Sequence, residues 1–244
     1  NNATITANYQ IGGLAGRSDF ANVTGSVNNG FINGNTFTTG TDSSNGGLIG
    51  QLRYGGNVTD SSNTGYVKGY YAGGLVGTLA EGRYNNTITG SSNTGIIEGR
   101  YIGGLAGRMA FATTYIETDP KTYTITNSYN DGQLESYLEV GGIVSTILGN
   151  FTFTNVYNNV DIINDVSENG RIGGLISTHT NGIVEISNSY NTGNITTPSE
   201  YAGGLIAYYL ASETAYLNTK LIITNSYNLG NVEARNVGGL AGYV

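Results

Sequence analysis

Side chains that could catalyse a reaction are scarce in this sequence. The 244 residues include one histidine, His179, and no cysteine. A zinc-peptidase HExxH helix needs two histidines on one face, so that motif is excluded. A Ser-His-Asp triad would depend on this single histidine. His179 follows a GGLIS string, at a position where other copies of the string carry Leu52, Leu79, Met109 and Ile147. We therefore expect His179 to be a core or turn residue rather than a base.

Carboxylates recur at one position of a short repeated segment, directly after an aliphatic residue. This position is occupied by Glu98, Glu135 and Glu233, and in other copies by Lys68, Ile163 and Thr196. Lys68 and Glu98 would form a cross-strand ion pair. A polysaccharide-degrading enzyme would need two carboxylates about 5–10 Å apart around a cleft. We predict that the chain is not an enzyme, with a polysaccharide-binding or polysaccharide-degrading β-helix as the further alternative.

The charge balance limits the partners. The formal net charge is −7, and only ten lysines and arginines are scattered along the chain, whereas phosphate backbones are bound by clustered basic residues. No apolar run approaches the length of a membrane-spanning helix. Glycine-rich strings such as GGLAGR lack the GK[ST] sequence and the following helix of a phosphate loop. We expect no nucleic-acid partner, no direct membrane insertion, no cofactor and no metal site.

The glycine strings belong to an internal repeat, which is the feature to establish first in such a sequence. A GG-[L/I] step begins at Gly12, Gly46, Gly73, Gly103, Gly141, Gly173, Gly203 and Gly238. Before most of these steps comes a polar turn, SSNTG or SYN-x-G, and between the two lies a short apolar segment such as GYVKG or GIIEG. Each unit of about thirty residues therefore contains three short strands separated by turns.

Aligned copies place aliphatic residues in columns that we expect to point inward. The first strand gives Val23, Val58, Ile88, Ile125, Phe153, Ile186 and Ile223; the second gives Val67, Ile97, Leu134, Ile162, Ile195 and Val232; the third gives Ala72, Ile102, Val140, Ile172, Ala202 and Val237. No single unit can bury these residues alone. The sequence predicts an all-β fold, a right-handed parallel β-helix (β-solenoid) over residues 1–244 as a single domain. It would have about seven to eight coils of three short strands each, at about 4.8 Å per coil.

Two further predictions concern the corners of the coils. A column of asparagines falls at the polar turn: Asn63, Asn93, Asn130, Asn158, Asn191 and Asn228. We expect each amide to hydrogen-bond to its equivalent one coil away, and the glycine that follows to supply a positive φ. After the GG step come two consecutive apolar columns, such as Leu75 and Val76. Strand alternation predicts that one of these columns points outward and must be covered by a loop or a partner.

Two insertions interrupt the regular spacing, at about 109–121 and 208–220, and they leave the solenoid at the same corner three coils apart. Insertions in repeat proteins often gather on a binding face. Their aromatic and acidic residues are candidates for contact with a glycan or a protein, and covering of the apolar stripe is the alternative. These candidates are Tyr115, Glu117, Asp119, Tyr209, Glu213 and Tyr216.

The strings GGLAGR, GGLVGTL and GGLIGQL resemble the GLUG motif, a repeat of bacterial cell-surface proteins that include adhesin-like proteins and some IgA-cleaving peptidases. The resemblance covers nearly the whole chain. GGIVS at Gly141, GGLIS at Gly173 and GGLIA at Gly203 depart from it because they lack the last glycine. The resemblance implies an extracellular or surface-attached repeat region and carries no catalytic residue to this chain.

These observations together predict a non-enzymatic extracellular or cell-surface protein with a structural or adhesive role. Neither end of the repeat array carries an obvious polar cap, and open strand edges pair readily with other strands. We therefore expect the chain to associate head to tail into a fibre or to form part of a surface stalk. The other expected partner is a host or surface glycan or protein. The candidate stacking residues are Ile5, Leu14, Ile223, Val232 and Leu240.

A rival prediction is binding to ice or another crystal surface. Outward threonines flank the first-strand column at Thr4–Thr6, Thr87–Thr89, Thr124–Thr126 and Thr152–Thr154. Flat threonine ladders of this kind resemble those of insect ice-binding solenoids. Glu185 and Ile222 interrupt the ladder.

Overall fold

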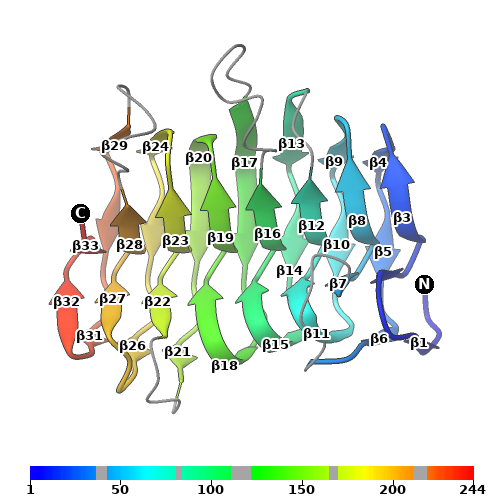
Figure 1. Ribbon diagram of the computed structural model, residues 1–244, viewed down its shortest axis with the longest axis horizontal. Coiled ribbons are helices and arrows are strands. Elements are labelled where there is room, and N and C mark those ends of the chain that lie inside the picture. Colours follow the sequence, from blue (N-terminus) through cyan, green and yellow to red (C-terminus); the bar gives the residue numbers. More distant parts are fainter. Residues whose placement is uncertain (37–42, 81–83, 111–121, 165–169, 211–218) are drawn as a thin grey trace.

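The computed structural model describes residues 1–36, 43–80, 84–110, 122–164, 170–210 and 219–244. Over these ranges the chain forms strands and no helix. Each strand pairs in parallel with the equivalent strand of the neighbouring coil. The coils stack side by side into a rod, with the two termini at its opposite ends (Figure 1). The prediction of an all-β parallel solenoid is confirmed, with about six turns, slightly fewer than the seven to eight coils expected.

The first predicted strand forms a sheet of twelve strands. Its main path comprises β4 (Asn22–Thr24), β9 (Asn57–Thr59), β13 (Asn86–Thr89), β17 (Thr122–Asn130), β20 (Asn150–Asn158), β24 (Ile183–Ser187) and β29 (Lys220–Thr224). Short strands at the polar turn complete the sheet: β5 (Val27–Asn28), β10 (Ser62–Asn63), β14 (Ser92–Asn93), β25 (Tyr190–Asn191) and β30 (Tyr227–Asn228). The predicted inward column from Val23 to Ile223 is in register throughout. Its five inner members are fully buried.

The second and third predicted strands form a ten-stranded sheet and a three-stranded sheet. The larger comprises β1 (Ile5–Thr6), β2 (Ile11–Gly12), β6 (Phe31–Asn33), β7 (Ser44–Gly46), β11 (Tyr66–Gly73), β15 (Ile96–Gly103), β18 (Leu134–Gly141), β22 (Arg171–Gly173), β27 (Tyr201–Gly203) and β32 (Asn236–Gly238). The smaller comprises β21 (Ile162–Ile163), β26 (Ile195–Thr196) and β31 (Val232–Glu233). In β11, β15 and β18 the two predicted strands run together as one, so three short strands per coil is not the rule there.

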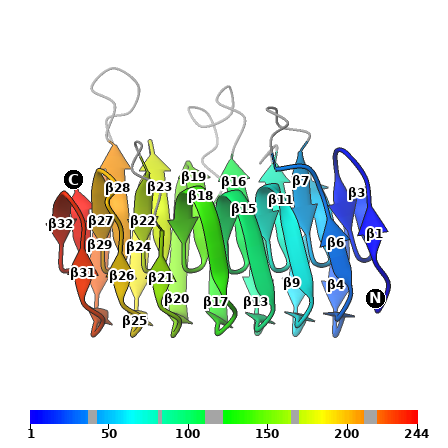
Figure 2. The same ribbon diagram turned by 90° about the horizontal axis from the view of Figure 1, so that it is seen from below.

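The residues after the GG step form a sheet of eight strands. These are β3 (Ala15–Asp19), β8 (Ile49–Arg53), β12 (Val76–Ala80), β16 (Ala106–Ala110), β19 (Val144–Leu148), β23 (Ile176–Thr180), β28 (Ile206–Leu210) and β33 (Ala241–Tyr243). Seen from below, all the coils keep the same order of strands along the rod (Figure 2).

The corner at the GG step corrects the prediction of an outward apolar column. Leu75 and Val76 are both fully buried, and the same holds for Leu105 and Ala106. The chain bends between β11 and β12, so alternation does not continue through the corner and two consecutive side chains enter the core. The bend requires glycine, because a Cβ on Gly73 would lie 2.2 Å from the carbonyl oxygen of Val76.

The polar turn confirms the asparagine column but corrects the role of its glycine. Positive φ values occur just before the column, at Gly25, Asp60, Gly90, Asn127, Asn155, Asn188 and Asn225. Gly65, which follows Asn63, is not among the positive-φ residues. A Cβ there would lie 2.1 Å from the carbonyl oxygen of Gly30. This glycine is therefore needed for close approach of two coils, and Asn, Asp or Gly supplies the left-handed backbone elsewhere.

Two ladders of polar side chains run inside the rod. The Nδ2 of Asn63 donates to the Oδ1 of Asn93 at 2.7 Å and to the carbonyl oxygen of Gly65 at 3.0 Å. The same pair of bonds recurs along the column, and Asn1 bonds to Asn28 at its N-terminal end. In the serine column, the Oγ of Ser91 accepts the N–H of Ser61 at 3.1 Å. The serines thus also join neighbouring coils.

Candidate functional site

The most regular outward feature is a pair of polar columns on the sheet of first strands, which we call the hydroxyl face. One column is hydroxyl-bearing over its whole length: Thr24, Thr59, Thr89, Thr126, Thr154, Ser187 and Thr224. The other is mixed, with Asn22, Asn57, Thr87, Thr124, Thr152, Glu185 and Ile222. The Thr-x-Thr triplets of the sequence indicate the interruptions of the second column but not the continuity of the first, because Thr24, Thr59, Ser187 and Thr224 belong to no such triplet.

Side chains on the hydroxyl face are held by one another. The hydroxyls of Thr89 and Thr126 lie 3.1 Å apart, as do those of Thr154 and Ser187. In the second column, the Nδ2 of Asn57 donates to the Oδ1 of Asn22 at 2.8 Å. Strand pairing fixes the spacing of the columns, and these bonds fix the rotamers. The face therefore presents hydroxyl groups in a preset repeating order.

A stack of four tyrosine rings lies next to the polar turn. Tyr129, Tyr157, Tyr190 and Tyr227 follow one another with ring centroids 4.9, 4.9 and 5.2 Å apart and nearly parallel planes. Each inner ring has both faces covered by its neighbours. The two end rings each have a ring neighbour on one face only: Tyr129 is in register with Ser92 on the preceding coil, and Tyr227, at the C-terminal end, is 46% exposed. The stack therefore joins coils and offers a ligand ring edges and hydroxyls rather than open faces.

The predicted acidic position is occupied as expected, and it forms a hydrogen-bonded cluster. Glu98 is in register with Lys68 and Glu135. The Nζ of Lys68 donates to the Oε1 of Glu98 at 2.6 Å, which confirms the expected ion pair. The hydroxyl of Tyr137 donates to the same oxygen, and the hydroxyl of Tyr66 donates to Oε2. Burial alone would raise the pKa of Glu98, but these three donors outweigh it and lower the pKa below its ordinary value. Such a carboxylate stays ionised and is a poor general acid.

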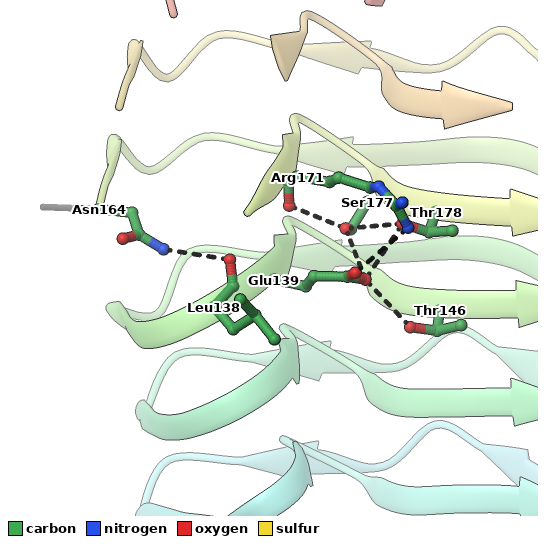
Figure 3. Close-up of polar contacts among 7 residues, drawn as sticks. All are labelled: Leu138, Glu139, Thr146, Asn164, Arg171, Ser177 and Thr178. Atoms are coloured by element: carbon green, nitrogen blue, oxygen red, sulfur yellow. Dashed lines mark hydrogen bonds and ion pairs between the residues drawn. The ribbon is translucent and has the colours of Figure 1, made fainter. Parts of the chain in front are cut away.

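A second carboxylate, Glu139, was not singled out from the sequence. Its Oε2 accepts from the hydroxyls of Thr178, Ser177 and Thr146 at 3.1, 3.2 and 3.3 Å, and its Oε1 lies 3.4 Å from the Nη1 of Arg171 (Figure 3). Burial raises the pKa of Glu139 above its ordinary value, and Arg171 and the hydroxyls oppose that shift. Among the described residues, none of its hydrogen-bond partners is a carboxylate. The cluster is an internal anchor: its hydrogen bonds and ion pair join β18, β22 and β23.

A sequence signal for Glu139 was present in the departures from the GLUG-like string. Ser177 replaces the last glycine of the string, and its Oγ contacts both Glu139 and the carbonyl oxygen of Arg171, at 3.2 and 2.8 Å. In a coil that keeps this glycine, a Cβ on Gly107 would lie 2.7 Å from the backbone nitrogen of Ala72. Ser177 thus supplies a hydroxyl donor to the buried acid from a position that is glycine in other coils.

Of the six loop residues expected to bind a partner, the structure describes one. Tyr115, Glu117, Asp119, Glu213 and Tyr216 lie outside the described residues. Tyr209 was wrongly placed in an exposed loop. It lies in β28, is 6% exposed, stacks on His179 at 4.9 Å and donates to the carbonyl oxygen of Gly182 at 3.3 Å. The solenoid continues to Leu210 and resumes at Lys220, so this insertion is shorter than predicted, and Met109 likewise belongs to β16.

His179 is a core residue, as expected. It is fully buried, in register with Ile147 and Tyr209, and its Nε2 lies 3.0 Å from the carbonyl oxygen of Gly149. Burial lowers the pKa of His179 to about 4. Because the imidazole is fully buried, it does not reach a substrate in this arrangement.

The predicted stacking residues all lie in the terminal coils. Leu14 and Leu240 are 51% and 38% exposed, whereas their equivalents in inner coils, such as Leu75, are fully buried. Ile5, Ile223 and Val232 are partly buried and pack against the core clusters from its edges. The two ends of the described rod therefore present the same columns that form its interior.

The described residues were also compared with the requirements of a metal site and of a membrane-spanning helix. The described residues hold no group of three or more histidine, cysteine, aspartate or glutamate side chains suited to a metal ion. No helix in the described part of the chain has the length and apolar character needed to cross a membrane.

Comparison with family models, with curated proteins and with solved structures finds no match for this chain.

Proposed function

We propose that this chain is a non-enzymatic structural and adhesive β-solenoid of the extracellular space or cell surface. The observation that carries the proposal is the repetition of the same interior ladders and outward columns along the described rod. A rod of this kind holds its ends apart and displays one surface many times over. The GLUG-like strings support a location at a bacterial cell surface. We also propose right-handed winding, the hand of about 98% of parallel crossover connections.

We also propose self-association through the ends, which the exposure of apolar residues there supports. Val237 and Leu240 are 51% and 38% exposed at one end, and Leu14 is 51% exposed at the other. Burying about 400 Å² of apolar surface at such a junction contributes about 10 kcal/mol before the cost of association, which is about 4–15 kcal/mol. Ladder hydrogen bonds and the free face of Tyr227 add to the contact. A head-to-tail contact that does not close produces a fibre.

The test introduces lysine at both Ile223 and Val232 and compares particle mass by light scattering over a range of protein concentrations. We expect the 244-residue chain to grow in mass with concentration and the double variant to stay monomeric. Thr196→Lys, an exposed position in an inner coil, is the matched control and should leave assembly unchanged. A chain that is monomeric at every concentration, or a double variant that assembles equally well, contradicts the proposal of end stacking.

The hydroxyl face supports a second candidate, binding to ice or another crystal surface. Its unbroken column of seven hydroxyl-bearing residues gives a repeat fixed by strand spacing. Regular spacing in two dimensions is what a crystal lattice can match. Thermal hysteresis of the purified chain is the test, with Thr89→Lys and Thr154→Lys as variants on the face. If the unmodified chain shows thermal hysteresis and both variants lose it, ice binding is supported. If the unmodified chain shows no thermal hysteresis, ice binding is ruled out.

A further inference from the structure

Two aromatic residues have an unusual backbone conformation. Phe20 and Tyr54 each have a φ of 59°, in the left-handed region. All other positive-φ residues of the described chain are glycine, asparagine or aspartate. For a bulky side chain this conformation is strained, at a cost of about 1–3 kcal/mol.

The strain is not imposed by the fold alone. Phe20 and Tyr54 directly follow β3 and β8, and in two later coils the residue that directly follows the equivalent strand is Gly149 or Asn181. Both of these also have a positive φ, 108° and 56°. The corner therefore requires a left-handed residue, and in those later coils it has glycine or asparagine, which adopt this backbone at low cost. The first coils retain aromatic rings there at a cost in stability, as is typical of functional positions.

The two rings join a third into one exposed cluster. The rings of Phe20 and Tyr54 stack with centroids 5.7 Å apart, and Tyr84 meets Phe20 edge-on at 5.4 Å. Phe20 is 58% exposed and Tyr84 is 48% exposed. Gly55 makes room for this arrangement, because a Cβ there would lie 2.7 Å from the Cβ of Tyr84. In contrast to the tyrosine stack, this cluster leaves ring surface open to solvent.

Charged groups form the rim of the cluster. The guanidinium of Arg53 lies 4.5 Å from the centre of the Tyr54 ring, and its Nε and Nη2 donate to the two carboxylate oxygens of Asp19 at 2.9 Å each. The hydrogen bond from Arg53 lowers the pKa of Asp19 below its ordinary value. Arg17, half exposed, lies 4.0 Å from the same carboxylate. Open aromatic surface thus adjoins fixed hydrogen-bond donors and acceptors.

We propose that Phe20, Tyr54 and Tyr84 form a platform that binds a sugar ring of a glycan chain, with Asp19 and Arg53 bonding its hydroxyl groups. A pyranose has an apolar C–H face and a polar edge, which matches open rings beside charged planar groups. A stable protein contact would need about 800 Å² from each partner, far more than three rings provide. The proposal gives the adhesive part of the proposed function a ligand class, and it rests on that part.

The test measures binding of four oligosaccharides, cellohexaose, chitohexaose, xylohexaose and mannohexaose, to the 244-residue chain by saturation-transfer NMR. We expect at least one to bind with contacts to aromatic protons, and the double variant Phe20→Asn and Tyr54→Asn to raise its Kd by about tenfold or more. Asparagine fits the left-handed corner, so this variant should unfold at the same or a higher temperature. Tyr9→Ala, which removes a ring that is 60% exposed and lies outside the cluster, should bind normally.

Three results would overturn this inference: no binding of any of the four sugars, equal binding by the double variant, or a double variant that loses self-association instead. The last result would assign the cluster to a contact between copies of the chain. Light scattering of the same variant separates this inference from the proposed function. Fibre growth that persists when sugar binding is absent leaves end stacking intact and removes only the platform.

Discussion

The side-chain amide of Asn93 lies between those of Asn63 and Asn130, accepting a hydrogen bond from one at 2.7 Å and donating to the other at 2.8 Å. It also donates to the carbonyl oxygen of Gly95 and accepts from its N–H. All four bonds are inside the rod, where the asparagines are fully buried. One side chain thus joins three coils and closes its own turn.

Replacing Asn93 by alanine should therefore destabilise the chain strongly. The change removes one of two acceptors from the amide of Asn63 and one of two donors from the Oδ1 of Asn130, and it leaves the turn at Gly95 unclosed. Each buried polar group left unpaired costs about 1–3 kcal/mol, so we expect a loss of about 2–5 kcal/mol. Urea denaturation followed by circular dichroism measures it. Thr94→Ala, at the exposed neighbouring position, should change stability by under about 0.5 kcal/mol; an equal loss in both variants would contradict the ladder's role.

The register of the first strands is tested at Ile125. Its side chain is fully buried between Ile88 and Phe153. Ile125→Asp would place an unpaired charge in the core and should cost several kcal/mol, on the order of 3–5. The matched control is Thr124→Asp, one residue earlier and facing outward. Thermal unfolding near that of the unmodified chain for Ile125→Asp, or a larger loss for Thr124→Asp, would show that the strand is turned the other way.

The buried imidazole makes stability depend on pH. The pKa of His179 is about 4 in the folded chain, against an ordinary 6.5. Above pH 6.5 the ring is neutral in both folded and unfolded chains and contributes no pH dependence. As the pH falls from 6.5 to 4 the unfolded chain takes up a proton that the folded chain does not, and stability is lost by about 3 kcal/mol.

The measurement is the free energy of unfolding at pH 7.5 and at pH 4.5, for the unmodified chain and for His179→Leu. Leucine occupies the equivalent positions 52 and 79. We expect the variant to lose less stability on acidification, because the carboxylates titrate in both proteins and only the imidazole differs. Equal losses in the two proteins would mean that His179 is accessible to protons in the folded state.

Glu139 allows a second electrostatic test. Glu139→Gln keeps the shape of the side chain and removes the charge that faces Arg171. If the cluster is an internal anchor, stability should fall by about 1–3 kcal/mol while self-association stays unchanged. A variant that keeps its stability but loses binding to a partner would instead identify Glu139 as part of a binding site.

The inward columns could be predicted because a period of two recurs at the same place in every copy, and a single coil cannot bury its apolar face. The corners could not be predicted in the same way. Leu75 and Val76 both enter the core because the chain bends at Gly74 and Leu75, between β11 and β12, and the bend itself has no periodic signal. The left-handed residue was assigned to Gly65, although Asp60 has that backbone, since aspartate is less conspicuous than glycine.

The residues of the candidate sites were harder to predict than the strands and corners. Tyr209 looked like a loop residue because the next strand, β29, begins only at Lys220, yet β28 extends to Leu210. Phe20 and Tyr54 gave no signal, because an aromatic residue is not expected in left-handed backbone. Glu139 became recognisable only in the structure, where the hydroxyl of Ser177 donates to it. In each case the missing information was the geometry of a corner rather than the pattern of a strand.

Electron microscopy of the purified 244-residue chain in negative stain tests the central claim most directly, because particle shape and particle length are read from the same image. A stack of coils that associates through its ends should give straight, unbranched particles of one width, with lengths that increase with protein concentration. The variant with lysine at Ile223 and Val232 should give only short rods of that width. Round compact particles would contradict the solenoid, and short rods at every concentration of the unmodified chain would contradict association through the ends.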